Sequence, residues 1–186
     1  MSDPVEMIGS HPASAAVVRT FVLGGVYGPL SPHLDNSFVA ILSALDGMMV
    51  TPPGGTSIID VRDVAQLLAA ALEPGKGARR FVAGGHFLTW AEWVTALSVA
   101  SEAEIAAMDV TTDDMIALGI ECDALRAAGE EALPLSEEAA IIMCSVVPTD
   151  DSATIRSLGI TYRPVHDTLV DTVNYLRTTD QLSAPA

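Results

Sequence analysis

The chain of 186 residues is long enough for one domain with a sizeable core, and 49% of its residues are apolar. Nine Lys and Arg residues against 24 Asp and Glu residues give a formal net charge of −15, which argues against a broad basic patch for nucleic acid or an anionic membrane. No run approaches the ~20 apolar residues of a membrane-spanning helix, and the N-terminus lacks the pattern of a signal peptide, so we expect a soluble cytoplasmic protein.

The first strand and helix are predicted from runs of apolar residues. Residues 1–14 show no apolar periodicity and are interpreted as a loose arm. Residues 15–23 (AAVVRTFVL) are a continuous, β-branched run that ends at Gly24, which is typical of a strand covered on both faces. Residues 36–45 place apolar side chains at helical spacing, and residues 48–55 then predict a short extended piece and a turn.

A second strand-to-helix step follows. Residues 57–60 (SIID) predict a short strand, and Asp63 is expected to be the N-cap of a helix over residues 64–72. That helix has almost no polar face, so we expect neighbours on most of its sides. Residues 78–85 (ARRFVAGG) predict another strand, which ends at two glycines.

The next helix carries the clearest start signal in the chain. Thr89 and Glu92 have the spacing of a capping box, and the helix that they predict covers residues 90–101. Residues 104–110 (EIAAMDV) follow it as a short predicted strand.

The remaining sequence is predicted to be largely helical. Residues 112–118 and 123–128 predict one interrupted helix, and residues 135–147 a second with favourable acidic side chains in its first turn. Residues 150–152 are expected to cap a short helix that reaches residue 158 and ends at Gly159, and Pro164 opens a final helix. The apolar stripe of that final helix consists of Leu169, Val173 and Leu176. Short strands mixed with helices predict an α/β fold.

The two cysteines, Cys122 and Cys144, cannot form a metal-binding quartet and lack the C-x-x-C spacing. We interpret them as partly buried thiols in a reducing compartment. No metal site is predicted.

Four motifs occur in the order in which extended short-chain dehydrogenases/reductases carry them. Residues 23–29 (LGGVYGP) are similar to the loop after the sixth strand of that family, and residues 59–65 (IDVRDVA) to its V-x-V-x-D-V-A step. Residues 80–85 (RFVAGG) are similar to its R-Y-x-x-x-G edge strand. Residues 158–164 (LGITYRP), followed by residues 171–172, are similar to its closing L-G-x-x-x-R-P and D-T helix. The chain thus resembles NAD-dependent epimerase/dehydratase and dihydroflavonol-reductase-like enzymes.

This resemblance covers roughly residues 15–182, nearly the whole chain, with residues 183–186 as a tail. It implies the C-terminal half of such an enzyme, with an α/β fold made of the last strands of an NAD(P)-binding Rossmann-type fold and a small C-terminal substrate domain. It also implies that backbone groups around Leu23, Gly24 and Val26 face the nicotinamide end of NAD(P). The alternative for this loop is a strand end that needs small residues for packing.

Two parts of the family's machinery are missing from the sequence. It has no Gly-x-x-Gly-x-x-Gly turn, whose backbone amides would approach the dinucleotide pyrophosphate. The family's chemistry needs a Tyr-x-x-x-Lys pair, but Lys76 is the only lysine and residue 72 is a leucine. We therefore predict no catalytic residue in this chain, and the choice between NAD and NADP stays open.

Two side chains are candidate substrate contacts. His33 follows the 23–29 loop and could face a substrate, with a surface histidine as the alternative. Arg62 could contact a substrate anion or a nucleotide, with an ion pair to Asp60 or Asp63 as the alternative.

The missing half leads to two functional hypotheses. Strands that are paired in the parent fold would here expose apolar faces and unpaired edges, and ~400 Å² of uncovered apolar surface corresponds to ~10 kcal/mol at ~25 cal/mol/Å². The first hypothesis is an NAD(P)-dependent oxidoreductase or epimerase for a hydroxyl or carbonyl group of a small molecule. It would be truncated, inactive alone, and either a homo-oligomer or completed by an N-terminal half. The alternative is a non-catalytic binding or scaffold protein that associates through its exposed apolar sheet edges.

Overall fold

A computed structural model describes residues 18–179 except residues 32, 35 and 74–76. Several features of the sequence analysis lie outside the described residues: the loose arm (residues 1–14), the first residues of the first predicted strand, Lys76 and the tail (residues 183–186).

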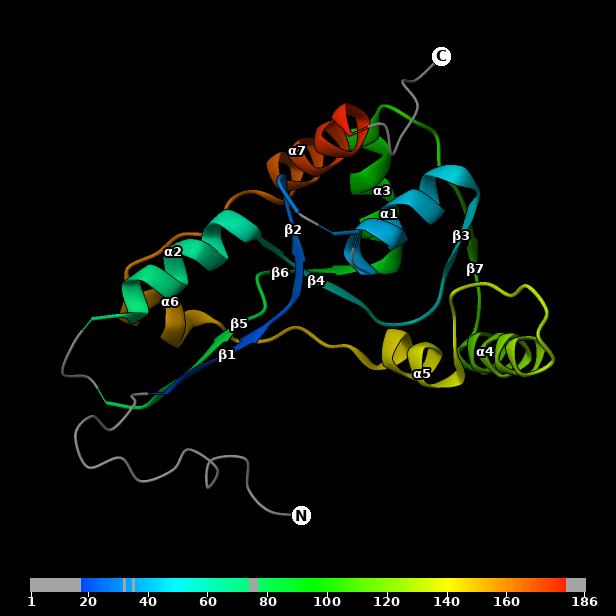
Figure 1. Cartoon of the computed structure of the whole chain (residues 1–186), viewed down its shortest axis with the longest axis horizontal. Coiled ribbons are helices and arrows are strands. Elements are labelled where there is room, and N and C mark those ends of the chain that lie inside the picture. Colours follow the sequence, from blue (N-terminus) through cyan, green and yellow to red (C-terminus); the bar gives the residue numbers. More distant parts are fainter. Residues whose placement is uncertain (1–17, 32, 35, 74–76, 180–186) are drawn as a thin grey trace.

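The described residues form seven strands and seven helices (Figure 1). The strands are β1 (Arg19–Leu23), β2 (Gly25–Tyr27), β3 (Met48–Thr51), β4 (Gly55–Asp60), β5 (Arg79–Ala83), β6 (His86–Thr89) and β7 (Ala106–Asp109). The helices are α1 (Asn36–Asp46), α2 (Val61–Ala71), α3 (Trp90–Ser101), α4 (Thr112–Ala127), α5 (Glu137–Ser145), α6 (Ser152–Leu158) and α7 (Val165–Thr178).

The strands form three small sheets. β1 and β5 are a parallel pair in which Phe21 lies opposite Phe81, with their rings stacked at 5.1 Å between centroids. β4 is the middle strand of the second sheet, parallel to β2 and antiparallel to β6. β3 and β7 form another parallel pair. This mixture of parallel pairs and crossover helices confirms the predicted α/β class.

Three apolar clusters hold these elements together. The largest joins α1, α3 and α7 over β2 and β4, and the three helices lie side by side in Figure 1. The second lies between α2, α6 and one face of the β1–β5 pair, and the third between α4 and α5. The stripe predicted for α7 is confirmed, because its three members are fully buried in the largest cluster: Leu169, Val173 and Leu176.

Start and stop signals that depend on neighbouring residues are confirmed. Thr89 and Glu92 form a complete capping box at the start of α3, in which each side chain accepts a hydrogen bond from the backbone N–H of the other residue. α6 ends at Gly159, whose φ of +65° lies in the left-handed region that favours glycine.

The predicted N-cap of α2 is wrong. Asp60 takes that role, since its backbone is extended and its carboxylate accepts a hydrogen bond from the Arg62 N–H at 2.8 Å. Asp63 lies in the first turn of α2, where it is buried and bonded to Arg163 instead.

The prediction of an interrupted helix over residues 112–128 is also wrong, because α4 is continuous. Its internal Gly119 packs against the chain just before α5, and a Cβ there would lie 2.6 Å from the carbonyl oxygen of Ser136. The glycine therefore allows two helices to approach closely and does not end one.

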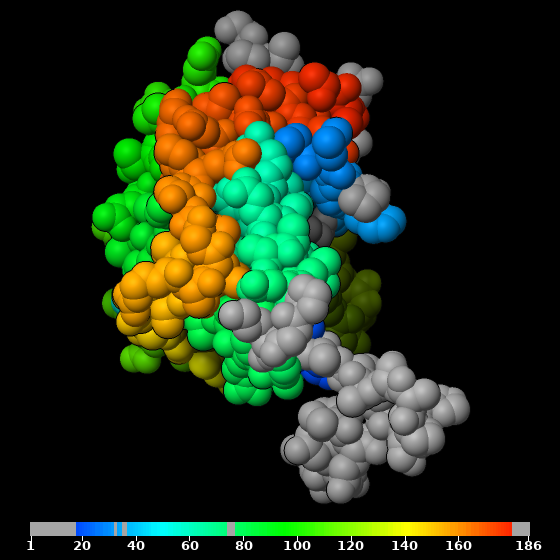
Figure 2. Space-filling model, turned by 90° about the vertical axis from the view of Figure 1, so that its left-hand side faces the viewer, coloured from blue at the N-terminus to red at the C-terminus, as the bar shows by residue number. Residues whose placement is uncertain are grey.

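β1 is not covered on both faces as predicted. Its side chains of Thr20 and Val22 are exposed, and among the described residues β1 pairs with β5 alone. α2 also presents an apolar face outward, with Leu68 48% exposed, and Figure 2 shows this helix at the surface beside α6 and α7. The predicted exposure of apolar side chains is thus present on β1 and α2. No helix within the described residues is long and apolar enough to cross a bilayer.

Candidate functional site

The chain passes from β1 to β2 through a loop that lies close to β5 and to the start of α2. The N–H of Gly24 donates to the carbonyl of Ala83 at 3.3 Å, and a Cβ at Gly24 would overlap the carbonyl oxygen of Gly84. Gly28 has a φ of +132°, and a Cβ there would lie 2.7 Å from the side chain of Val61. Packing alone therefore requires glycine at both positions.

Leu23 and Val26 lie differently in this loop. The side chain of Leu23 is 38% exposed at the carboxyl end of β1, where a ligand can approach it. Val26 pairs with Ile59 of β4, and its side chain packs in the α2–α6 cluster. Because this side chain is packed, a ligand could contact Val26 only through its backbone. The turn after β2 encloses a cavity of about 130 Å³, lined by residues of the loop together with Phe38 and Val61.

Arg62 is held by two carboxylates at the start of α2. Its Nε and Nη2 donate to the two oxygens of Asp60 at 2.8 and 2.6 Å, and its Nη1 forms an ion pair with Asp171 of α7 at 2.7 Å. Thr168 of α7 donates to Asp60 at 3.0 Å. The ion pair with Asp60 that the sequence offered as an alternative is present, and the one with Asp63 is replaced by Asp171.

These contacts set the charge of the buried Asp60. Burial alone would raise the pKa of Asp60, but the hydrogen bonds from Arg62 and Thr168 outweigh burial and hold that pKa below its usual value. The hydrogen bond to Asp60 likewise raises the pKa of the Arg62 guanidinium. The result is a charged bridge between the end of β4, the start of α2 and the middle of α7.

A second bridge connects α2 to the chain before α7. Asp63 accepts from the backbone N–H of Arg163 at 2.7 Å and from its Nη1 at 2.6 Å. The carbonyl of Arg163 lies 2.8 Å from Nε2 of His86, at the start of β6.

Asp151 forms a third bridge, next to the two glycines that follow β5. Its carboxylate accepts from the N–H of Gly85 at 2.8 Å, the Tyr162 hydroxyl at 3.0 Å and the Thr149 hydroxyl at 2.9 Å. Burial, and then the charge of Asp151, raise the pKa of Tyr162, so this phenol stays protonated and donates. From the sequence Asp151 was interpreted only as part of a helix cap, because its partners lie 66 and 11 residues away.

His33 is exposed on the chain that follows the loop. The side chain of Ser31 donates to the His33 carbonyl at 2.6 Å, and the hydroxyl of Tyr175 donates to the Ser31 carbonyl at 2.6 Å, which ties this turn to α7. Leu23 and Gly24 lie beside the end of β5, Val26 pairs with β4, and Arg62 lies in the first turn of α2. Within the described residues, no hydrogen bond or ion pair connects His33 to Arg62.

The acidic groups of the three bridges accept hydrogen bonds from arginine, threonine or tyrosine donors and from backbone N–H groups, which suits them to position backbone segments. No group of three His, Cys, Asp or Glu side chains in the described part of the chain could hold a metal ion.

Comparisons with known proteins place this fold. No family model matches the sequence, and no curated protein matches it. Among solved structures, gox2253 is 20% identical with a TM-score of 0.70, over 89% of this chain and 50% of that one. PA4631, a nucleoside-diphosphate-sugar epimerase from Pseudomonas aeruginosa, is 19% identical with a TM-score of 0.62, over 87% of this chain and 48% of that one.

A third similar structure contains a cofactor. UDP-glucose-4-epimerase from Stenotrophomonas maltophila, solved with bound NAD and formylated UDP-arabinopyranose, is 15% identical with a TM-score of 0.58, over 88% of this chain and 48% of that one. The chain spans about half the length of the solved proteins that it matches. Its fold is therefore that of part of an extended short-chain dehydrogenase/reductase, as the four motifs predicted.

Proposed function

We propose, from a fold that corresponds to half of an extended short-chain dehydrogenase/reductase, that this chain is the substrate-binding half of an NAD(P)-dependent oxidoreductase or epimerase. Its substrate would be a small molecule that reacts at a hydroxyl or carbonyl group. The observation that carries the proposal is the glycine loop of residues 23–29 packed against the start of α2, within a fold that matches an epimerase solved with NAD over 88% of this chain.

The residues of this chain fit only one end of the dinucleotide. Leu23 is exposed at the carboxyl end of a parallel strand, which suits contact with a nicotinamide ring. The glycine at position 24 is explained by the Gly84 carbonyl and needs no ligand. The sequence supplies no glycine-rich turn for the pyrophosphate. We therefore expect no tight binding of NAD(P) by this chain alone.

The substrate contacts in this proposal are His33 and Arg62. His33 is exposed four residues after Pro29, at the end of the loop. Arg62 keeps about a third of its side chain exposed while it holds Asp60 and Asp171, and a guanidinium has five N–H donors, so it could also donate to an anionic or hydroxyl-bearing group. Their role is to hold a substrate, since the proton-transferring pair must come from elsewhere.

Completion of the fold is the second part of the proposal. β1 ends the sheet of the described residues with Val18, Val22 and Leu23 between 38% and 49% exposed. A strand added at this edge would pair the backbone of β1. A complementing N-terminal half or a second copy of the chain would supply that strand.

Nucleotide titration tests the proposed function. NAD(H) and NADP(H) would be added to the chain alone, and to the chain mixed with a polypeptide that carries the glycine-rich turn and the Tyr-x-x-x-Lys pair, with the unfolding temperature as readout. Saturating nucleotide should stabilise only the mixture, by ~2.7 kcal/mol at one hundred times Kd. Carbonyl reduction by the purified chain alone would contradict the proposal.

A non-catalytic scaffold is the second candidate, and it is favoured by the edge of β1 that has no partner strand among the described residues. Val22→Lys places a charge on the open face of β1 and should weaken association, because edge lysines oppose strand addition. Leu72→Lys, at a 72% exposed site beyond α2, is the matched control. Sedimentation should show a smaller assembly for Val22→Lys alone. A monomeric parent chain without dye-accessible apolar surface would rule out the scaffold.

A further inference from the structure

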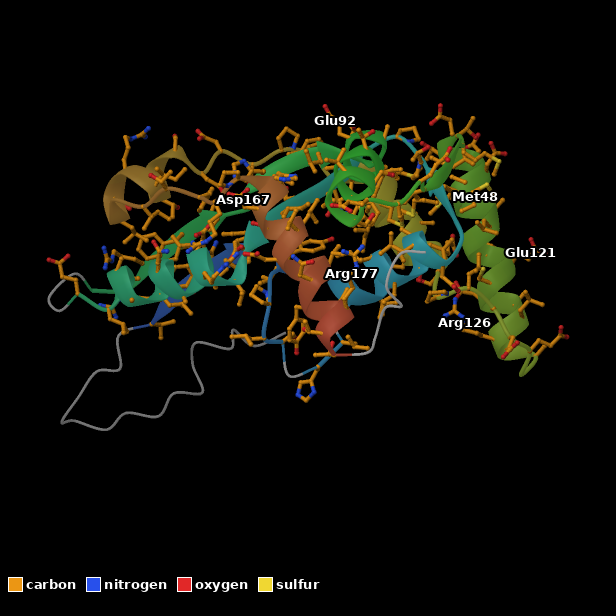
Figure 3. All side chains as sticks on the ribbon, turned by 90° about the horizontal axis from the view of Figure 1, so that it is seen from above. Met48, Glu92, Glu121, Arg126, Asp167 and Arg177 are labelled. Atoms are coloured by element: carbon orange, nitrogen blue, oxygen red, sulfur yellow. The ribbon has the colours of Figure 1, made fainter. Side chains whose placement is uncertain are left out.

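A second cavity lies away from the glycine loop, between the end of α1, β3, α4 and the chain before α5. Its volume is about 400 Å³, within the range of ~300–1,000 Å³ that is typical of small-molecule sites. Four of the seven methionines of the chain line it: Met48, Met49, Met115 and Met143. Figure 3 shows Met48 next to α4, from which Met115 also reaches the cavity.

Methionine gives this cavity an adaptable apolar wall. Its unbranched thioether is flexible and polarisable, so methionine-rich surfaces mould themselves to ligands of different shapes. Met115 is 2% exposed and packs in the α4–α5 cluster, whereas Met48 is 57% exposed at the rim. The methionines thus extend from the core to the opening of the cavity.

The backbone around these flexible side chains is fixed by long-range hydrogen bonds. The indole N–H of Trp90 donates to the carbonyl of Met143 at 3.0 Å. Arg126 donates to the carbonyl of Leu135, and Asp123 accepts from the N–H of Glu137 at 2.9 Å, so both ends of the turn into α5 are attached to α4. The cavity is therefore preformed, which reduces the entropy lost when a ligand binds.

The polar groups at this cavity select against anions. None of its described lining residues is Lys, Arg or His, and Ser43 and Asp46 are two of its polar lining residues. The whole chain carries a formal charge of −15. A nucleoside diphosphate would be repelled here, whereas a hydroxyl group could donate to Asp46 or Ser43.

The two cavities are linked by α1. Phe38, near its start, lines the cavity beside the glycine loop, and Asp46, at its end, lines the methionine cavity. Eight residues separate them, which is roughly 12 Å along a helix. A molecule bound in the methionine cavity could therefore reach the glycine loop only with a part that extends away from the cavity along α1.

We propose that the methionine-lined cavity binds an uncharged, largely apolar small molecule that carries a hydroxyl group. The idea that this cavity anchors the remote part of a substrate rests on the proposed function, whereas the binding of such a molecule to the cavity does not. The structure thus favours an apolar molecule that carries a hydroxyl group over a nucleotide sugar as the substrate class.

Binding of an uncharged fluorescent probe to the purified chain tests this site. N-phenyl-1-naphthylamine should gain fluorescence on binding, 1-naphthol should displace it, and uridine diphosphate at the same concentration should not. Met48→Asp adds a charge at the exposed rim, and Ser43→Trp fills the opening without a charge. Each should raise the Kd of the probe at least tenfold.

Val99→Asp is the matched control, because Val99 is 61% exposed on a different apolar groove between α3 and α7. It should change the Kd less than twofold. Unchanged binding in Met48→Asp and Ser43→Trp, or a loss in Val99→Asp alone, would overturn the site, as would displacement by uridine diphosphate. These results are independent of NAD(P) binding, so failure of the site and failure of the proposed function are distinguishable.

Discussion

The carboxylate of Asp63 accepts two hydrogen bonds from Arg163, one hundred residues further along the chain, at 2.7 Å from its backbone N–H and 2.6 Å from its guanidinium. Asp63 is 1% exposed, whereas the side chain of Arg163 is about one-third exposed. This pair attaches the first turn of α2 to the chain that enters α7, and therefore connects the two main apolar clusters.

Asp63→Asn should destabilise the chain. Removal of one partner from a buried ion pair costs ~3–5 kcal/mol, and the partial exposure of Arg163 reduces the expected loss to ~1–3 kcal/mol. Urea unfolding measures the change, with Glu121→Gln at an exposed position of α4 as the control. Equal stability of the two variants would mean that the pair does not hold α2 to α7.

Gly119→Ala tests the close approach of α4 to the chain before α5. An added methyl group would lie 2.6 Å from the Ser136 carbonyl, so we expect a loss of ~1–3 kcal/mol although alanine favours helix by ~1 kcal/mol. Ala124→Gly, at an exposed position of the same helix, should cost only the ~1 kcal/mol of helix propensity. Stabilisation by Gly119→Ala in urea unfolding would contradict the packing explanation.

Whether sequence reasoning could find a contact depended on how far apart its two partners lie along the chain. Thr89 and Glu92 are three residues apart, so their capping box is readable from the sequence. The predicted interruption between residues 118 and 123 was wrong, because the reason for Gly119, the Ser136 carbonyl, lies on the chain just before α5. Asp63 and Asp151 were assigned to local caps for the same cause, since their partners come from remote segments. Motif order predicted the fold, but the long-range contacts of each acid required the structure.

Asp60 predicts a pH dependence with a definite sign. Its pKa in the folded chain lies below the ordinary value of 3.8. The folded state therefore binds the proton less readily than the unfolded state, and the stabilisation is complete above pH 3.8 and lost as pH falls through the lower folded pKa. Arg62 stays charged throughout this window and adds no dependence.

Urea unfolding between pH 7 and pH 3 measures this dependence for the parent chain and Asp60→Asn. The parent should be the more stable at pH 7, and the difference should narrow toward pH 3. Other carboxylates titrate in both proteins, so the comparison isolates Asp60. A difference that stays constant over this range would show that the charge of Asp60 is not what stabilises the bridge.

Gly24→Ala separates the two explanations for the loop between β1 and β2. If packing requires the glycine, the methyl group meets the Gly84 carbonyl and the chain loses ~1–3 kcal/mol with no nucleotide present. If only a cofactor requires it, the chain alone is as stable as the parent, and only the nucleotide affinity of the completed protein falls. We expect the first result, since the nearest obstacles to a Cβ are backbone and Ser57 atoms of this chain.

Leu23→Ala is the complementary variant. Its side chain is 38% exposed, so its truncation should cost less than ~1.5 kcal/mol in urea unfolding of the chain alone. In the completed protein the same change should weaken NAD(P)H binding, because Leu23 is the side chain of this loop that a nicotinamide ring could contact. Unaltered nucleotide affinity in Leu23→Ala, measured beside a destabilised Gly24→Ala, would reduce the loop to a packing element and favour the scaffold function.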